Sequence, residues 1–402
     1  MIKKCRSCEG KKLNEVISLG KLYLSDFTDG NRYPPRYPLD LVFCGDCGLV
    51  QLKNTTPREL LYTKRYGYKS GVTKTMNEEL ENIAENSKKY VNGESRKLLV
   101  DIGANDGTLF KYFGRDFMKV GIDPVKKFAK ELKGFADIVI SDYFNLASFQ
   151  KAVGSHQADI VTAIACFYDI DNLNDFVREV KSILALDGVF VVQQNYLVGM
   201  LEQNAFDNIV HEHITYFSLT ALDNLLMRHG LEVFDVEKRN INGGSFTTAI
   251  GRKGLRSIEK SVKRMKRYEE KINLKGKGIY NNFSKRVKKN GEKINKFIRE
   301  EVKKGKRVYL YGASTRGNTL IQYYKLGRDL IKKAVERNPE KWGKKIASLG
   351  IPIISEEEAR KEKPHYMLVA PWHFKDEFLE REKEFLSDGG HFIFPLPEFE
   401  VI

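Results

Sequence analysis

The stretch RKLLVDIGANDGTLF, residues 96–110, predicts the fold of the central part of the chain. Its apolar run is typical of a buried β-strand, and Gly103 and Gly107 allow a tight turn into a following helix. Further strands are predicted at 117–123, 136–141, 158–166 and 187–196, with a helix at 173–185. A closing antiparallel pair is predicted at 231–240 and 244–253. This alternation favours an α/β domain with a doubly wound, Rossmann-like sheet over residues 71–255.

Three carboxylates follow strands of this predicted sheet. Asp101 suits a cationic amino-acid headgroup, Asp123 is placed to accept hydrogen bonds from ribose hydroxyls, and Asp142 can meet an adenine amino group. Asn105 stands where the dinucleotide fingerprint has glycine, so an NAD site is the weaker alternative. The set resembles S-adenosylmethionine (SAM) dependent class I methyltransferases, and a plain βα turn is the structural alternative. The candidate cofactor residues are Asp101, Gly103, Asn105, Gly107, Asp123 and Asp142.

Four of the five cysteines form two C-x-x-C pairs, CRSC and CGDC. Two thiolates at this spacing can reach one ion, and two such pairs complete a tetrahedral zinc site. Such a site is closed to substrate, so it predicts a structural role in an N-terminal domain at 1–70. The predicted ligands are Cys5, Cys8, Cys44 and Cys47, whereas Cys166 is expected to be a buried small apolar residue.

The sequence NIVHEHITYFS, residues 208–218, places Glu212 between His211 and His213. It follows the fifth predicted strand, at the edge of the sheet where ligands bind in open α/β folds. Imidazole titrates near neutral pH and a neighbouring carboxylate can raise its basicity, so we expect a general base, with His213 first and His211 second. A second metal site and a structural role for buried histidines are the alternatives.

The overall composition is that of a soluble globular protein, with 42% hydrophobic and 11% aromatic residues. No apolar run approaches the ~20 residues that cross a bilayer, and the N-terminus lacks the apolar core of a signal peptide. These features predict a cytoplasmic protein that makes no use of a membrane.

The net charge of +15 comes from one segment, because residues 252–307 carry 22 Lys and Arg against 6 Glu. Long surface helices with solvated lysines are the simplest interpretation, and an RNA-modifying methyltransferase is the alternative. RNA binding calls for aromatics that can stack on bases. The aromatics here have a helical core spacing, which makes a nucleic-acid partner the less favoured choice: Tyr268, Tyr280, Phe283 and Phe297.

Residues 306–327 predict a second strand, glycine-bounded turn and helix within a C-terminal unit at 256–402. Backbone amides of the turn, together with Ser314 and Arg316, can receive a phosphate or a pyrimidine ring, because Arg offers forked donors. An ordinary turn with a surface Arg, and core packing for the tryptophan, are the alternatives. The candidate substrate-binding residues are Asn242, Ser314, Arg316, Asn318 and Trp372.

Taken together, these features resemble the three-domain sugar C-methyltransferases that act on nucleotide-linked keto-deoxysugars. The resemblance spans nearly the whole chain and rests on CRSC…LYLSDF…CGDCGLVQL, YGYKSG, DIGANDGTL, HEHITYFS, NGGSF and YGASTRGNTL. It implies a zinc-binding domain, a class I SAM domain and a C-terminal α/β domain that helps to hold a nucleotide-sugar. A non-catalytic relic of this fold is disfavoured by the intact acidic and histidine positions.

The resemblance also implies that His213 removes a proton from the sugar, with Glu212 and Tyr66 or Tyr68 lining the pocket. The family often has tyrosine before the H-E-H motif, where this chain has Val210. It often has histidine before G-G-S, where this chain has Asn242. Both C-methylation and O-methylation remain open at this stage, because His213 can take a proton from carbon or from a hydroxyl group.

Overall fold

A computed structural model describes residues 1–402 except 31, 62–68, 92, 94 and 242. Its central sheet has seven strands in the order β11-β12-β9-β8-β5-β6-β7, and the five from β5 to β9 run parallel. The strands are β5 Lys97–Ile102, β6 Phe117–Ile122, β7 Ile138–Ile140, β8 Ala158–Ile164, β9 Leu184–Asn195, β11 Leu231–Arg239 and β12 Ser245–Arg252. The predicted doubly wound α/β sheet is therefore confirmed.

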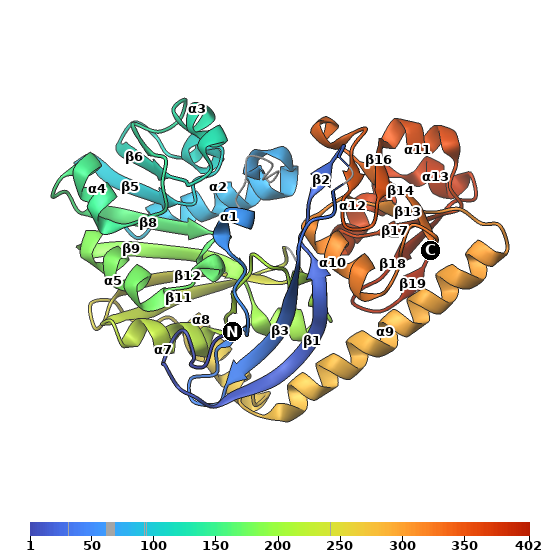
Figure 1. The fold of residues 1–402 in the computed structure, drawn as a ribbon. Helices are drawn as coiled ribbons and strands as arrows, with labels where there is room; N and C mark the ends of the chain where they lie inside the picture. Colours follow the sequence, from blue (N-terminus) through green and yellow to red (C-terminus); the bar gives the residue numbers. More distant parts are fainter. Residues whose placement is uncertain (31, 62–68, 92, 94, 242) are drawn as a thin grey trace.

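Helices cover both faces of this sheet because its strands are apolar on both sides (Figure 1). Val189 and Val191 of β9 pack towards α2, whereas Phe190 and Val192 point towards the face that α5 and α7 cover. The helical elements of this part are η1 Ser70–Val72, α2 Lys74–Lys88, η2 Thr108–Tyr112, η3 Lys126–Phe128, α3 Ala129–Leu132, α4 Leu146–Val153, η4 Phe167–Asp169, α5 Leu173–Ile183, α6 Leu197–Glu202, η5 Phe206–Asn208 and α7 Leu219–Met227.

The helix expected after the glycine turn is only a 3₁₀ segment, η2 Thr108–Tyr112. The chain leaves it at Phe113, whose extended backbone leads into Gly114. Lys119 from β6 donates to the carbonyls of Phe110 and Phe113, and so satisfies two acceptors at the end of the short segment. The sequence prediction of a full helix at this point was wrong.

The N-terminal sheet has the order β1-β3-β4-β10. Its first three strands come from the beginning of the chain, but β10, which follows the H-E-H motif, pairs with β4 through Thr215 and Gln51. The segment after His213 is thus part of two structural units. The bounds are β1 Leu13–Tyr23, β3 Arg36–Cys44, β4 Val50–Leu52 and β10 Thr215–Tyr216, with the short helix α1 at Arg58–Leu61.

The C-terminal sheet has the order β19-β18-β17-β13-β14-β16-β15-β2, and β2 is contributed by the N-terminal region. Its strands are β2 Phe27–Thr28, β13 Val308–Tyr311, β14 Ile331–Glu336, β15 Lys345–Ile346, β16 Ile351–Ser355, β17 Tyr366–Val369, β18 His391–Phe394 and β19 Glu400–Val401. Its helices are α10 Thr315–Tyr323, η6 Pro339–Lys341, α11 Glu356–Glu362, η7 Trp372–Phe374, α12 Lys375–Arg381 and α13 Lys383–Ser387. The domain limits 1–70, 71–255 and 256–402 stay predictions, since β2 and β10 cross them.

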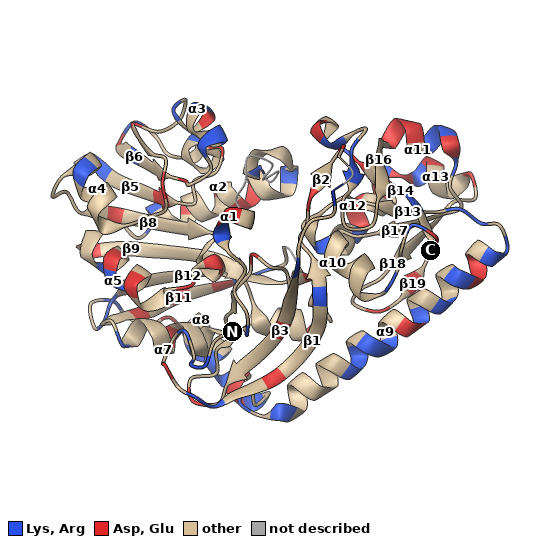
Figure 2. Cartoon of the chain, in the orientation of Figure 1, with Lys and Arg blue, Asp and Glu red and all other residues tan. Residues whose placement is uncertain are grey.

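The basic segment forms the helices α8 Lys260–Lys271 and α9 Lys277–Lys303. Figure 2 shows Lys and Arg along the outward side of α9. Tyr280 and Phe283 are buried, and Tyr280 stacks on Phe43 with ring centroids 4.7 Å apart. These two rings hold α9 against the N-terminal sheet and are not available for base stacking. Within the described residues, no helix is both long and apolar enough to cross a membrane.

Candidate active site and zinc centre

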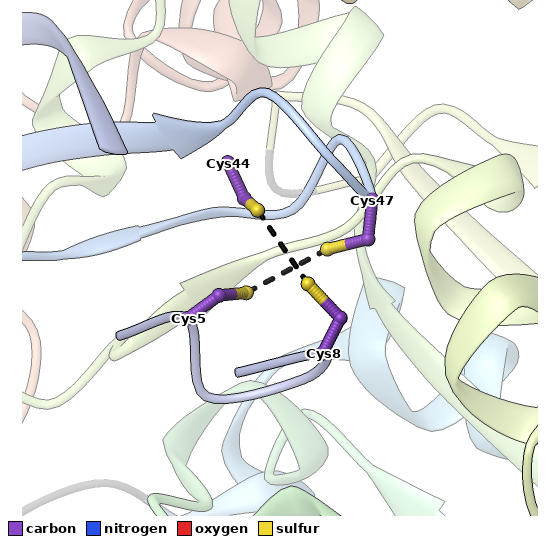
Figure 3. A group of neighbouring side chains, drawn as sticks. All are labelled: Cys5, Cys8, Cys44 and Cys47. Atoms are coloured by element: carbon purple, nitrogen blue, oxygen red, sulfur yellow. Dashed lines mark hydrogen bonds between the residues drawn. The ribbon is translucent and has the colours of Figure 1, made fainter. Parts of the chain in front are cut away.

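The four predicted zinc ligands come together at the base of the N-terminal sheet (Figure 3). Their sulfur atoms all lie within 4.8 Å of one another, and the Cys5–Cys47 and Cys8–Cys44 pairs are each 3.6 Å apart. A tetrahedron with Zn–S bonds of about 2.3 Å has edges of about 3.8 Å, so the spacing fits one zinc ion. The cysteines are buried or half-buried, consistent with a closed structural site.

A cavity of about 280 Å³ lies at the carboxyl ends of β5, β6 and β8, where ligands bind in open parallel sheets. Gly103, with φ of +79°, has no room for a side chain, because a Cβ there would lie 2.9 Å from the Cys166 sulfur. Gly107 also has positive φ, and a Cβ there would press on Leu132 and Phe135. Gly103 lines the cavity, while Gly107 shapes the turn beside it.

Asp101 is the buried carboxylate of this cavity. Its Oδ1 accepts a hydrogen bond from Thr162 Oγ1 at 2.6 Å. Burial raises the pKa of Asp101 to about 7, against the lowering effect of that hydrogen bond. A cationic ligand group placed here would favour the charged carboxylate, as expected for an amino-acid headgroup.

Asp123 and Asn105 lie together at the second strand end and both line the cavity. The Asp123 oxygens accept from the backbone N–H groups of Asn105 and Val125, each at 2.8 Å, and burial raises the pKa of Asp123. Each oxygen keeps a lone pair for a ribose hydroxyl. Asp142, by contrast, is exposed and bonds the backbone N–H of Tyr143; it is Tyr143 that lines the cavity.

Burial shifts the pKa values of the first two residues of the H-E-H motif, His211 and Glu212. His211 is 4% exposed, its Nε2 lies 3.2 Å from the carbonyl oxygen of Tyr37, and burial lowers its pKa to about 4. This contact with β3 indicates a structural role for His211. Burial raises the pKa of Glu212 to about 6.

His213 is not among the residues that line the cavity, and its link to the cavity is Tyr168, the neighbour of the lining residue Asp169. The Nδ1 atom of His213 is 3.0 Å from the carbonyl oxygen of Asn208, and its ring packs edge-on against Tyr168 with centroids 4.4 Å apart. Because a carbonyl only accepts, Nδ1 carries the proton and Nε2 keeps its lone pair. Burial, assisted by the charge of Arg316, lowers the pKa of His213 to about 3, so the ring is neutral at pH 7. Asp169, next to Tyr168, lines the cavity.

Arg316 of the C-terminal unit reaches across to the central sheet. Its Nε donates to Asp207 Oδ2 at 2.8 Å, its Nη2 forms an ion pair with the same oxygen at 2.8 Å, and Trp372 Nε1 donates to that oxygen at 3.1 Å. Ser314 caps α10 through the N–H of Gly317. Asn318 is buried and accepts from Ser348. The expected Tyr66, Tyr68 and Asn242 lie outside the described residues.

Several buried polar atoms on β9, β12, η5 and η7 have no hydrogen-bond partner among the described residues. Gln193 and Thr247 are direct neighbours across β9 and β12, and Gln193 also pairs with Ile164, which lines the cavity. An unpaired buried polar group costs roughly 1–3 kcal/mol, so we expect water or a polar ligand group beside such atoms. Asp207, Asn208 and His373 have such atoms near Arg316, whereas Gln193 and Thr247 lie on the α2 face of the sheet and Gln194 on its opposite face.

Sequence reasoning missed three residues of this region. Arg58, from the N-terminal α1, lines the cavity and lies over the ring of Tyr143. Tyr168 follows β8 and holds the ring of His213. Asp207 is the one charged residue in AFDNIV, residues 205–210, and this lone charge in an apolar stretch was the signal that could have revealed it.

The parallel sheet, the glycine turn and the acidic cavity together define a class I SAM-dependent methyltransferase. Three family models match the chain: a zinc binding domain at 5–62, a methyltransferase domain at 72–236 and a C-methyltransferase C-terminal domain at 240–397. The chain is 30% identical to the C-methyltransferase NovU of Streptomyces niveus, over 100% of this chain and 97% of that protein. The protein belongs to the SAM-dependent C-methyltransferase family, with a zinc-binding N-terminal domain.

Solved methyltransferase structures resemble part of the chain. A SAM-dependent methyltransferase from Clostridium acetobutylicum is 12% identical, with a TM-score of 0.36, over 44% of this chain and 92% of its own. The mitomycin 7-O-methyltransferase MmcR is 19% identical, with a TM-score of 0.36, over 48% of this chain and 57% of its own.

Proposed function

We propose that the protein transfers the methyl group of SAM to a carbon atom of a nucleotide-activated keto-sugar, with His213 as the general base. The observation that carries the proposal is the set of unpaired polar atoms on Asp207, Asn208 and His373, around Arg316 and His213. A sugar ring offers hydrogen-bonding groups in several directions, and so it can satisfy amide, carboxylate and hydroxyl groups at once. A largely apolar acceptor would leave these atoms unpaired.

Each group of the site then has a task. When bound, SAM supplies an electrophilic methyl group; Asp101 holds its ammonium group and Asp123 its ribose. His213 Nε2 takes the proton from the carbon next to the ketone, and the C–H electron pair passes into an enolate. With SAM bound, this carbon would take the methyl group and S-adenosylhomocysteine would be the leaving group, while His213 would return its proton to water. We assign the nucleotide end to the turn at 312–317 and to Trp372.

The nucleotide assignment follows from charge and shape. Arg316 has forked donors that suit phosphate, although one fork already holds Asp207. Trp372 is 4% exposed and its ring lies against Gly243, where a Cβ would come within 3.1 Å. Glu212, half-buried beside His213, is placed to accept a sugar hydroxyl or to orient the base. Tyr66, Tyr68 and Asn242 keep the pocket-lining role that the family resemblance implies for them.

The first experiment identifies the acceptor with a thermal-shift panel of nucleoside-diphosphate sugars in the presence of S-adenosylhomocysteine. With the best ligand as substrate, His213→Asn should retain S-adenosylhomocysteine affinity and lose about 10²–10⁴ in turnover. His229→Asn is the matched control, because this histidine lies at the end of α7 and contacts Asn174. Normal turnover in the His213 variant would remove this residue from the mechanism. RNA binding that falls steeply with salt, without sugar-nucleotide binding, would overturn the substrate class.

A further inference from the structure

Asp207 belongs to neither the motif nor the cofactor cavity, yet it is completely buried in η5, between α6 and the H-E-H segment. One of its oxygens accepts two hydrogen bonds from the C-terminal unit, one from Arg316 Nε and one from Trp372 Nε1, and it forms an ion pair with the Arg316 guanidinium. A carboxylate buried this deeply is tolerated only with such compensation. We call these three residues the Asp207 clasp.

The residue next to Asp207 is the one that holds the catalytic imidazole. The carbonyl oxygen of Asn208 accepts from His213 Nδ1 at 3.0 Å and from the Tyr216 hydroxyl at 3.1 Å. The Asn208 side chain is fixed as well, because its Oδ1 accepts from Asn195 Nδ2 at the end of β9. A displacement of Asp207 therefore moves the acceptor that decides which nitrogen of His213 carries the proton.

We propose that Asp207 is a positioning residue, through which Arg316 and Trp372 of the C-terminal unit fix the orientation and tautomer of His213. The proposal rests on the proposed function in one respect, namely that His213 is the base. The carbonyl of Asn208 keeps the proton on Nδ1 and leaves the Nε2 lone pair for the substrate. Without the clasp, the buried carboxylate must take up a proton, admit water or shift, and each of these disturbs the Asn208 carbonyl.

The test compares Asp207→Asn with Asp223→Asn. Asp223 is the matched control, because it also pairs with a cation, Lys266, in a half-buried position, but lies on α7 away from the site. In the full-length protein labelled with ¹⁵N-histidine, the wild type and the control should show His213 protonated on Nδ1 alone. The Asp207 variant should show both tautomers. Its kcat should fall about 10- to 100-fold, with KM for SAM unchanged, since misplacement of a catalytic group by about 1 Å has effects of this size.

A second variant covers the case in which the Asp207 change prevents folding. Trp372→Phe removes one donor from the clasp and keeps an aromatic ring, so it should produce the same tautomer change to a smaller extent. A single Nδ1-protonated His213 in both variants overturns the proposal, whatever their turnover. The spectrum also separates the positioning role of Asp207 from the role of His213 as base. A mixture of tautomers in the Asp207 variant supports the positioning role even if full activity of His213→Asn shows that His213 is not the base.

Discussion

Lowering the pH from 8 to 6 should weaken the binding of S-adenosylhomocysteine, because Asp101, the carboxylate to which we assign its ammonium group, becomes protonated. Asp101 is 4% exposed, and burial raises its pKa from 3.8 to about 7. This pKa shift means that the buried site destabilises the charged carboxylate by about 4 kcal/mol. A bound ammonium group stabilises the charged carboxylate, so the ligand and the proton compete for Asp101.

The expected size of the effect follows from the titration of Asp101. With a pKa near 7, about nine-tenths of the carboxyl groups are ionised at pH 8 and about one-tenth at pH 6. The ligand needs the ionised form, so affinity is complete above pH 7 and is lost as the pH falls through 7. Between pH 8 and pH 6 the dissociation constant should rise about tenfold, as long as the complex keeps its charge.

Isothermal titration calorimetry with S-adenosylhomocysteine across this range measures the effect directly. Asp101→Asn should bind more weakly at pH 8 and lose most of the pH dependence, since the amide does not titrate. Asp123→Asn removes the neighbouring buried carboxylate that we assign to the ribose, so it should weaken binding at every pH and keep the pH dependence that Asp101 sets. If the Asp101 variant kept the full tenfold change, another group would be responsible and the headgroup assignment would be refuted.

Two further predictions concern stability. Cys44→Ser should lower the zinc content and destabilise the N-terminal sheet, because one of four tetrahedral ligands is lost; a fully zinc-loaded variant with an unchanged melting temperature would contradict the Cys₄ site. Glu269→Ala should lower the free energy of unfolding by about 2–5 kcal/mol, since the buried carboxylate accepts from the Tyr196 hydroxyl and from two N–H groups at the start of α7. Urea unfolding measures this loss, and Glu270→Ala, which changes an exposed neighbour, should have little effect.

The sequence by itself determined the features that depend on local spacing. Two C-x-x-C pairs predicted a zinc site from their spacing, and the four sulfur atoms lie close enough together to bind one ion. The carboxyl ends of parallel strands lie on one edge of a sheet, so Asp101 and Asp123 could be placed together from the strand pattern alone. Glycine at 103 is required by backbone geometry, which the turn pattern already indicated.

Only the tertiary structure decided the features that depend on contacts between distant segments. Asp142 follows a strand just as Asp123 does, but the chain turns so that it faces solvent and Tyr143 lines the cavity. Arg316 looked like a free phosphate ligand in sequence, yet it is held by Asp207, 109 residues earlier in the chain. The two histidines of H-E-H differ because one packs on the zinc-binding domain and the other on Tyr168. Burial and long-range pairing set the charge and role of such groups, and neither is written in the neighbouring residues.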